Sequence, residues 1–198
     1  MTDPQPWVAS TYRGLADLLA TSAIDIWDAP TLCENWLVRH VVAHVTMPVR
    51  LTPAQFAADL AAAGGDFTVL SDTVAARDAA LPRTELLDQL RSPTLHAWQP
   101  PGGGAAGAVS HAVIHSLDVT IALDRPAVAP AGAVSAVLDT LTNASGTIFG
   151  IDLAGVRLEA TDTDRRWGSG EVVRGDSGSL VALLSGRTLP DGRSLPRG

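Results

Sequence analysis

The spacing of apolar residues changes once along this chain, near residue 150, and this change limits the folds that the chain can adopt. Up to about residue 148, apolar residues recur at the three- and four-residue intervals of amphipathic helices. After that point, residues 155–161 alternate between apolar and polar side chains, as in a strand with one solvent-facing side. We therefore predict a mainly α protein, with a helical bundle over residues 1–148 and a small α+β region over residues 149–198.

Prolines and glycines divide the helical part into segments. Pro48 interrupts one pattern, Thr52 and Pro53 are typical of a helix start, and Gly64 is typical of a helix end. Asn35 is the expected N-cap of the helix that carries the first histidines. The expected helices span residues 7–20, 35–47, 54–63, 71–81, 84–98, 105–123 and 131–145.

The C-terminal region is predicted to contain three short strands and one helix. The strands are expected near residues 155–161, 165–167 and 171–174, and the helix over residues 177–184. A region of about 45 residues is too small to form a stable hydrophobic core by itself, so we expect it to pack on the bundle. The tail 187–198 is rich in Pro, Gly and Arg and is expected to be loose.

Charge and composition exclude several classes of partner and location. The net charge is −7 and all 14 basic residues are Arg, which argues against nucleic-acid or anionic-membrane binding. No run of 18 apolar residues is present, and the N-terminus lacks the basic and apolar segments of a signal peptide. The lone Cys33 excludes an intrachain disulfide. We expect a cytoplasmic protein with no transmembrane helix.

Two histidine pairs are the main candidates for chemistry. His40 and His44 are four residues apart in one expected helix, and His111 and His115 are four apart in another. Residues at this spacing lie on one helix face, so such a pair can offer two imidazoles to one ion. A third ligand must then come from another helix, and three protein ligands with an open position are typical of catalytic zinc.

Helical periodicity separates these histidines by their surroundings. His44 falls in the apolar stripe of its helix, whereas His40 lies on the flank and could border the same site. His111, His115 and Asp118 share one stripe of a hydrophobic helix, which is costly unless these groups are paired or coordinated. Asp118 is placed to accept a hydrogen bond from a ligand imidazole. Buried neutral histidines with backbone or Asp partners would account equally well for the spacing.

Other reactive or flexible features carry less weight. Cys33 has no local feature that would lower its pKa, and a buried structural role is expected. Residues 100–104 lack the Lys-Ser/Thr ending of a phosphate-binding loop and are interpreted as a flexible connection that could act as a lid. His96 is expected to be a packing or surface residue, and the tryptophans are expected to be packing anchors.

The two histidine blocks together carry a family resemblance. Residues 31–44, from Thr31 to His44, and residues 110–119 resemble the two signatures of the mycothiol-dependent maleylpyruvate isomerase family. That family belongs to the DinB-like superfamily of metal-binding four-helix bundles. Residues 155–168 and the Gly186-Arg187 pair also look like the family's short C-terminal region. The resemblance implies a DinB-like four-helix bundle with a small C-terminal α+β appendix.

The resemblance also implies a site and a chemistry. It implies a divalent metal, with zinc expected, held by His44, His111 and His115, with Asp118 and His40 around these ligands. Mycothiol, a low-molecular-weight thiol of actinobacteria, would be the co-substrate, because a coordinated thiol loses its proton. His40 stands where relatives often carry Asp, which leaves open a closed four-histidine site with a structural role.

The sequence is therefore compatible with two functions. The first is a metal-dependent, thiol-using isomerase or S-transferase that acts on a small electrophilic substrate. The second is a non-catalytic bundle in which a structural metal or histidine network stabilises the fold and a small molecule or partner binds. A homodimer is compatible with either function. The sequence does not name the electrophile or the metal.

Overall fold

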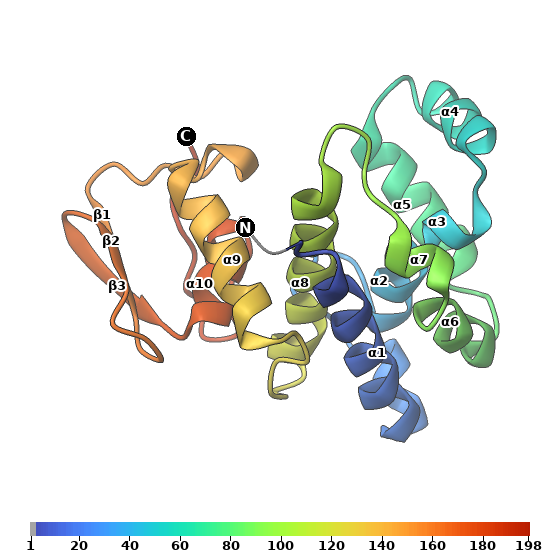
Figure 1. Ribbon diagram of the computed structural model, residues 1–198, viewed down its shortest axis with the longest axis horizontal. Helices are drawn as coiled ribbons and strands as arrows, with labels where there is room; N and C mark the ends of the chain where they lie inside the picture. Colours follow the sequence, from blue (N-terminus) through green and yellow to red (C-terminus); the bar gives the residue numbers. More distant parts are fainter. Residues whose placement is uncertain (1–2) are drawn as a thin grey trace.

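The computed structural model describes residues 3–198, and helix α8 lies at its centre. On one side α8 packs against α1 and α2, and on the other it packs against α9 and α10 (Figure 1). Helix α5 packs against α2 and completes the bundle. The bounds of these helices are α1 (Pro6–Thr21), α2 (Val38–Val45), α5 (Phe67–Asp78), α8 (Gly104–Ala122), α9 (Ala131–Asn143) and α10 (Ser177–Leu184).

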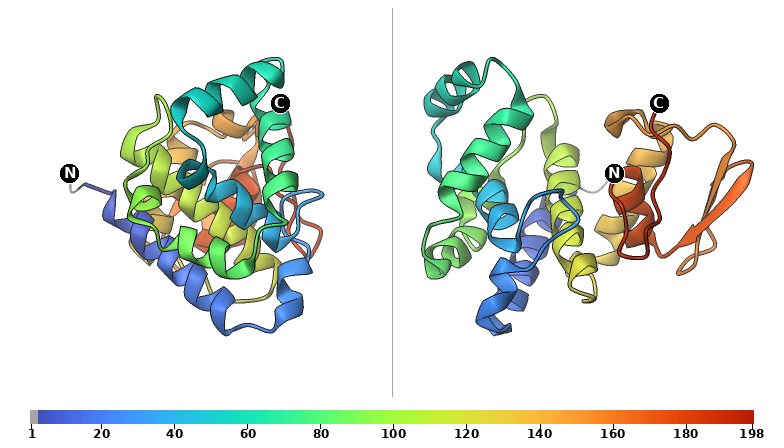
Figure 2. Two further views of the ribbon diagram at one scale, coloured as in Figure 1. Left: turned by 90° about the vertical axis from the view of Figure 1, so that its right-hand side faces the viewer. Right: turned by 180° about the vertical axis from the view of Figure 1, so that it is seen from behind.

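Short helices surround this bundle. Helices α3 and α4 follow α2, and α6 and α7 lie against α1 and α3 (Figure 2). Their bounds, with those of the two 3-10 turns, are η1 (Ile24–Asp28), α3 (Met47–Arg50), α4 (Pro53–Ala62), α6 (Arg83–Leu90), α7 (Pro93–Ala97) and η2 (Thr147–Phe149). The mainly α fold class predicted from the sequence is confirmed.

Helix α8 is apolar because neighbours cover it on two sides. Its length and composition alone would suit a membrane span, but 56% of the apolar window is buried in the structure, as in a core helix. Its Leu117 belongs to one hydrophobic core cluster that also contains Leu15 of α1, Val41 of α2 and Leu183 of α10. The boundary at residue 148 stays a prediction, since this cluster contains side chains from both sides of it.

The structure corrects three expected helices. The helix expected over 84–98 is interrupted after Leu90, because Ser92 caps a new helix that begins at Pro93. The helix expected from residue 71 begins at Phe67, where the carboxylate of Asp66 accepts the first free amides. Asn35 has a φ of 64° and is not an N-cap, and α2 begins three residues later.

The C-terminal region contains a three-stranded sheet with the order β2-β1-β3. Strand β1 pairs antiparallel with β2 and parallel with β3, so the link between β2 and β3 crosses the start of β1. Gly170 makes this crossing with a φ of 126°, where any Cβ would collide with the backbone of Gly155. The strands are β1 (Val156–Ala160), β2 (Arg166–Gly168) and β3 (Glu171–Gly175).

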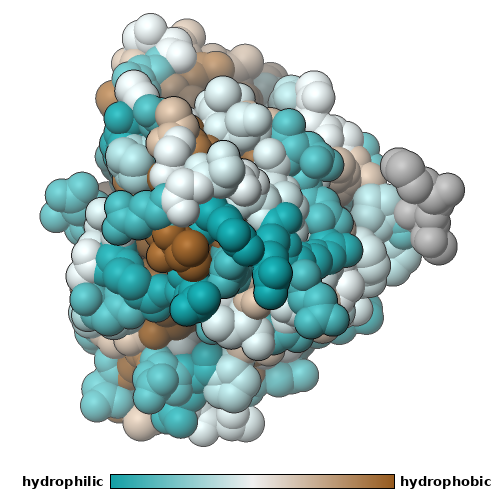
Figure 3. Space-filling view, turned by 90° about the vertical axis from the view of Figure 1, so that its left-hand side faces the viewer, coloured by the Kyte–Doolittle hydropathy of each residue, from teal (hydrophilic) through white to brown (hydrophobic). Residues whose placement is uncertain are grey.

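The sheet lies at the edge of the molecule, with α9 and α10 between it and α8 (Figures 1 and 2). Seen from the side of the sheet, the surface is mainly hydrophilic around a small apolar patch (Figure 3). The sheet therefore supports α10 from outside and stands away from the histidine-bearing helices.

The C-terminal tail is ordered by packing, which corrects the expectation that it is loose. Leu189 and Leu195 are buried in the core cluster. The amide of Asp152 donates to the carbonyl of Pro196 over 2.9 Å, which ties the tail to the segment after α9. These contacts place Arg187, three residues after the end of α10, beside Asp118 in the C-terminal half of α8.

Candidate metal centre

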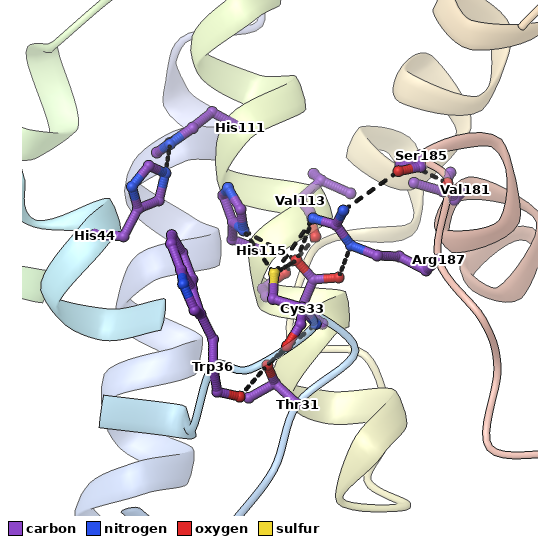
Figure 4. Close-up of polar contacts among 12 residues, drawn as sticks. Thr31, Cys33, Trp36, His44, His111, Val113, His115, Val181, Ser185 and Arg187 are labelled. Atoms are coloured by element: carbon purple, nitrogen blue, oxygen red, sulfur yellow. Dashed lines mark hydrogen bonds and ion pairs between the residues drawn. The ribbon is translucent and has the colours of Figure 1, made fainter. Parts of the chain in front are cut away.

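Three imidazoles from two helices meet at one point in the bundle (Figure 4). His44 comes from α2, and His111 and His115 come from successive turns of α8. One ligand nitrogen from each ring lies within 4.8 Å of the others, and the Nε2 atoms of His44 and His111 are 3.1 Å apart. Two nitrogens bound to one tetrahedral zinc ion are separated by about 3.3 Å, so this spacing suits a shared ion.

The opposite nitrogens of the two α8 histidines are tied to other side chains. The Nδ1 atom of His111 lies 3.0 Å from the hydroxyl of Tyr12 on α1. The Nδ1 atom of His115 donates to the carboxylate of Asp118 over 2.9 Å. Both contacts orient the rings, and the bond to the Asp118 carboxylate leaves the Nε2 lone pair of His115 available, which is how ligand histidines are held around metal ions.

Burial keeps His44 and His111 uncharged. Desolvation lowers the pKa of His44 well below its usual value, and the neighbouring His115 and His111 lower it further. The pKa of His111 is lowered in the same way by burial and by His115. Neutral imidazole is the form that binds metal ions, so both rings are held in the ligating state at neutral pH. The Nδ1 atom of His44 is buried without a hydrogen-bond partner.

A second group of donor atoms lies behind His115. The Cys33 thiol donates to Oδ2 of Asp118 over 3.0 Å, and Arg187 donates to both carboxylate oxygens over 2.8 and 3.0 Å. Burial would raise the pKa of Asp118, but the hydrogen bonds from His115 and Arg187 outweigh it and hold the pKa well below its usual range. Asp118 is thus an ionised carboxylate that is already neutralised by Arg187.

Cys33 behaves as a protonated thiol in this group. Burial, and then the negative charge of Asp118, raise the pKa of the thiol above its usual value. This agrees with the structural role expected for Cys33. The Cys33–His115–Asp118 group could also bind a metal ion by its spacing. Since its carboxylate is engaged by Arg187 and its thiol is protonated, we favour the three histidines as the candidate ligands.

The three histidines face a cavity of about 810 Å³. Arg187 lines it as well, and Trp98 lies with its ring centre 5.4 Å from that of His111. Trp36 packs beside His44 with ring centres 5.0 Å apart. The remaining walls are mostly apolar and are formed by Met47, Pro48, Leu51, Pro53, Phe56, Phe67, Pro100, Pro101, Ile114 and Phe149.

Two histidines considered from the sequence lie outside this cluster. His40 caps α2, where its Nδ1 accepts a hydrogen bond from the amide of Leu37 over 3.1 Å. It therefore does not border the ligand set, and the four-histidine arrangement is not formed. His96 is buried and its Nε2 donates to the carbonyl of Leu90 over 2.9 Å, which matches the packing role expected for it.

Sequence reasoning gave no site role to two residues, although Arg187 was among those that carry the family resemblance: Tyr12 contacts His111, and Arg187 contacts Asp118. Tyr12 was visible only as one member of an apolar stripe, and its hydroxyl reaches His111 from another helix. Arg187 lies in the tail that was expected to be loose. One signal pointed to it: an acid in a hydrophobic helix needs a cation, and none follows Asp118 within one helical turn.

The comparisons with known proteins agree with the sequence resemblance. Residues 8–98 match the family model described as the mycothiol maleylpyruvate isomerase N-terminal domain. The resemblance to this family is thereby confirmed over these residues, which contain His44 but not the α8 histidines. No protein with a curated description matches the chain.

Two solved structures share the fold along nearly the whole chain. They are the crystal structures of the mycothiol-dependent maleylpyruvate isomerase and of a histidine-to-alanine mutant of it. Each is similar over 98% of this chain and 95% of its own, with 18% identity and a TM-score of 0.57. At this identity the likeness establishes a common fold, including the C-terminal appendix.

Proposed function

We propose that this chain, whose residues 8–98 match the mycothiol maleylpyruvate isomerase family, is a metal-dependent enzyme that uses a thiol. The reaction would be isomerisation or S-transfer on a small electrophilic substrate, with mycothiol as the thiol. The observation that carries the proposal is the convergence of three imidazoles on one cavity. The solved relative that shares this fold is named for mycothiol-dependent isomerisation.

The donor set fits a divalent ion of the zinc type. His44, His111 and His115 would hold it, since three imidazoles suit zinc and leave one position for an exogenous ligand. When bound, such an ion lowers the pKa of a coordinated thiol, so that the thiol is available as a nucleophilic thiolate. The only thiol of the chain, Cys33, is engaged with Asp118, so the reacting thiol would arrive with a substrate.

The surrounding residues position and protect this centre. Asp118 holds the His115 ring through Nδ1, and Tyr12 holds the His111 ring in the same manner. Arg187 neutralises the Asp118 carboxylate, so no uncompensated negative charge is buried beside the histidines. Most of the cavity wall is apolar, and a cavity of about 810 Å³ falls within the range of small-molecule sites.

The alternative of a purely structural metal is disfavoured by one feature. A structural zinc site is closed by a fourth protein ligand. Here the fourth histidine of the two pairs, His40, caps a helix, and the other three face the cavity. This arrangement supports a site with an open position.

Metal content and thiol dependence test the proposal. We expect purified protein to carry about one divalent ion per chain by elemental analysis. His44→Ala should lose this ion, and the thiol-dependent formation of product from a model electrophile, followed by mass spectrometry, should disappear with it. His40→Ala is the matched control on the same helix. It should retain the ion and lose only about 1 kcal/mol of stability with the cap.

Circular dichroism of both variants separates loss of ligand from loss of fold. If protein with all three histidines intact binds no metal under metal-replete conditions, both the site and the mechanism are wrong. If His40→Ala loses the ion as completely as His44→Ala does, the assignment of the ligands is wrong.

A further inference from the structure

We propose that Trp36 is a positioning residue for the candidate metal ligands and that Asp72 of α5 holds its ring in place. This role rests on the proposed function, because it concerns how the three histidines are kept in a metal-binding geometry. An asymmetry among the three histidines points to it.

The ring of His44 lacks the hydrogen-bonded anchor that the other two rings have. Nδ1 of His111 lies 3.0 Å from the hydroxyl of Tyr12, and Nδ1 of His115 contacts the carboxylate of Asp118 over 2.9 Å. Nδ1 of His44 is buried, and no group in the part of the chain that the structure describes pairs with it. Metal-binding imidazoles are normally oriented through the nitrogen that does not bind the ion. The orientation of the His44 ring therefore depends on packing.

Trp36 supplies this packing. Its ring centre lies 5.0 Å from that of His44, and 6.4 Å from that of His115 with the two planes only 23° apart. The indole thus reaches one ligand from α2 and one from α8 (Figure 4). Phe67, at the start of α5, adds an edge contact to His44 with ring centres 6.5 Å apart. These separations lie within the range in which aromatic rings attract one another.

The backbone of Trp36 is fixed by the loop before α2. Its carbonyl accepts hydrogen bonds from the amide of Thr31 over 3.1 Å and from the hydroxyl of Thr31 over 2.8 Å. Its amide donates to the carbonyl of Cys33 over 3.0 Å. Asn35, directly before it, has a φ of 64°, a conformation that Asn tolerates better than most residues. The loop therefore leaves only the side-chain torsions of Trp36 to be fixed.

Asp72 fixes the far end of the indole. Nε1 of Trp36 donates to Oδ1 of Asp72 over 2.9 Å. Within the described residues, the Asp72 side chain has no other hydrogen-bond or ion-pair partner, although it lies on the exposed side of α5. Helix α5 thus acts on His44 twice, directly through Phe67 and through Asp72 and Trp36. Loss of the Asp72 contact would free the indole to rotate away from both imidazoles.

The affinity for Co²⁺ tests this role without an assay of activity. Full-length protein is stripped with a chelator and titrated with Co²⁺ against a competing chelator, and the visible absorption of the bound ion reports its coordination geometry. We expect Trp36→Leu to lower the affinity about tenfold and to change the absorption spectrum. Asp72→Ala removes one exposed hydrogen bond and should lower the affinity about threefold, with an unchanged denaturation midpoint for the metal-free protein.

Asp72→Asn separates the hydrogen bond from the charge. The amide oxygen of Asn still accepts from Nε1 of Trp36, whereas the negative charge is gone. We expect this variant to keep the affinity and the spectrum of the unmodified protein. If it loses as much affinity as Asp72→Ala, the carboxylate acts on the ion by its charge, and its role in holding Trp36 is overturned.

Two control variants separate positioning from general loosening. Thr73→Ala alters the neighbouring exposed position of α5, whose hydroxyl bonds only within its own helix, and should leave the affinity unchanged. Trp98→Leu removes an indole beside His111, a ring that Tyr12 already holds, and should lower the affinity less than about twofold. Losses as large as those of Asp72→Ala and Trp36→Leu, respectively, would overturn the positioning role.

The unmodified protein distinguishes this role from the proposed function. If it binds no Co²⁺, the proposed metal-dependent function is refuted and the role of Trp36 is refuted with it. If it binds Co²⁺, and Trp36→Leu binds the ion equally tightly with the same spectrum, only the role of Trp36 is overturned.

Discussion

Arg187 donates from Nε to Oδ1 of Asp118 over 2.8 Å, and this bond joins two residues that are 69 positions apart in the chain. It connects the segment after α10 to the C-terminal half of α8, where the same carboxylate holds the ring of His115. The contact makes the C-terminal region part of the candidate metal centre. A residue outside the helical bundle thus sets the charge at its core.

Removal of Arg187 should destabilise the fold strongly. Arg187→Gln would leave the Asp118 carboxylate buried without its cation, and loss of one partner of a buried pair costs about 3–5 kcal/mol. Chemical denaturation monitored by tryptophan fluorescence measures this change. The control is Arg165→Gln, which breaks the exposed pair with Asp139 and should cost at most about 1 kcal/mol. Equal losses in the two variants would show that the Arg187–Asp118 pair is not buried as described.

The hydroxyl of Tyr12 should contribute to both the stability of the fold and the affinity for a metal ion. Tyr12→Phe keeps the buried ring but leaves Nδ1 of His111 without its partner, which should cost about 1–3 kcal/mol. If His111 is a ligand, metal affinity measured by competition with a chelator should also fall about 10–100-fold.

Thr11→Val provides the comparison on the same helix. The hydroxyl of Thr11 is buried without a hydrogen-bond partner, so its replacement should leave both stability and metal affinity unchanged or slightly improved. A drop in metal affinity of similar size in Thr11→Val would mean that the effect of Tyr12→Phe is general loosening of α1.

Protonation of Asp78 at low pH should lower the free energy of unfolding. Burial would raise its pKa, but the hydrogen bond from Arg77 and the charge of Arg50 hold the pKa below its usual value. Because the pKa of Asp78 is lower in the folded protein, the unfolded chain binds more protons than the folded protein at low pH. Asp78 therefore stabilises the fold fully above its unfolded pKa of about 3.9, and this stabilisation is lost as the pH falls from there through the pKa of the folded protein. We expect the free energy of unfolding to decline less steeply between pH 5 and 3 in Asp78→Asn than in the unmodified protein. Asp164→Asn, at an exposed carboxylate, is the control, and a change of slope of the same size in both variants would contradict the assignment.

The crossing at Gly170 should tolerate no side chain. Gly170→Ala would push Cβ into the backbone of Gly155 and unpair β1 from β3. Gly192→Ala also requires a positive φ, of 85°, but has nothing within 4 Å, so it isolates the conformational cost of about 1–2 kcal/mol. Thermal unfolding should show a clearly larger loss for Gly170→Ala. Comparable losses would mean that the strands rearrange around the added carbon.

Residue spacing and the positions of Pro and Gly predicted those helices and strands whose bounds depend only on neighbouring residues. The helix with the α8 histidines, the strands after residue 150 and the helix at Ser177–Leu184 follow from residue spacing and from punctuation by Pro and Gly. The two predictions that failed, at Ser92 and at His40, also have physical causes. Ser92 and Pro93 start a new helix because a cap and a proline outweigh the apolar spacing that runs through them. His40 accepts a hydrogen bond from the free amide of Leu37 at the start of α2, and helical periodicity does not predict such a capping contact.

By itself, the sequence determined which side chains share a helix face, and so it determined the candidate set His44, His111 and His115 with Asp118. Only the tertiary structure decided which groups from other elements complete the set. Tyr12 and Arg187 arrive from α1 and from the segment after α10, through packing of a shared core. Helical periodicity is a property of neighbours within about one turn, whereas contacts between helices depend on how distant apolar faces bury one another.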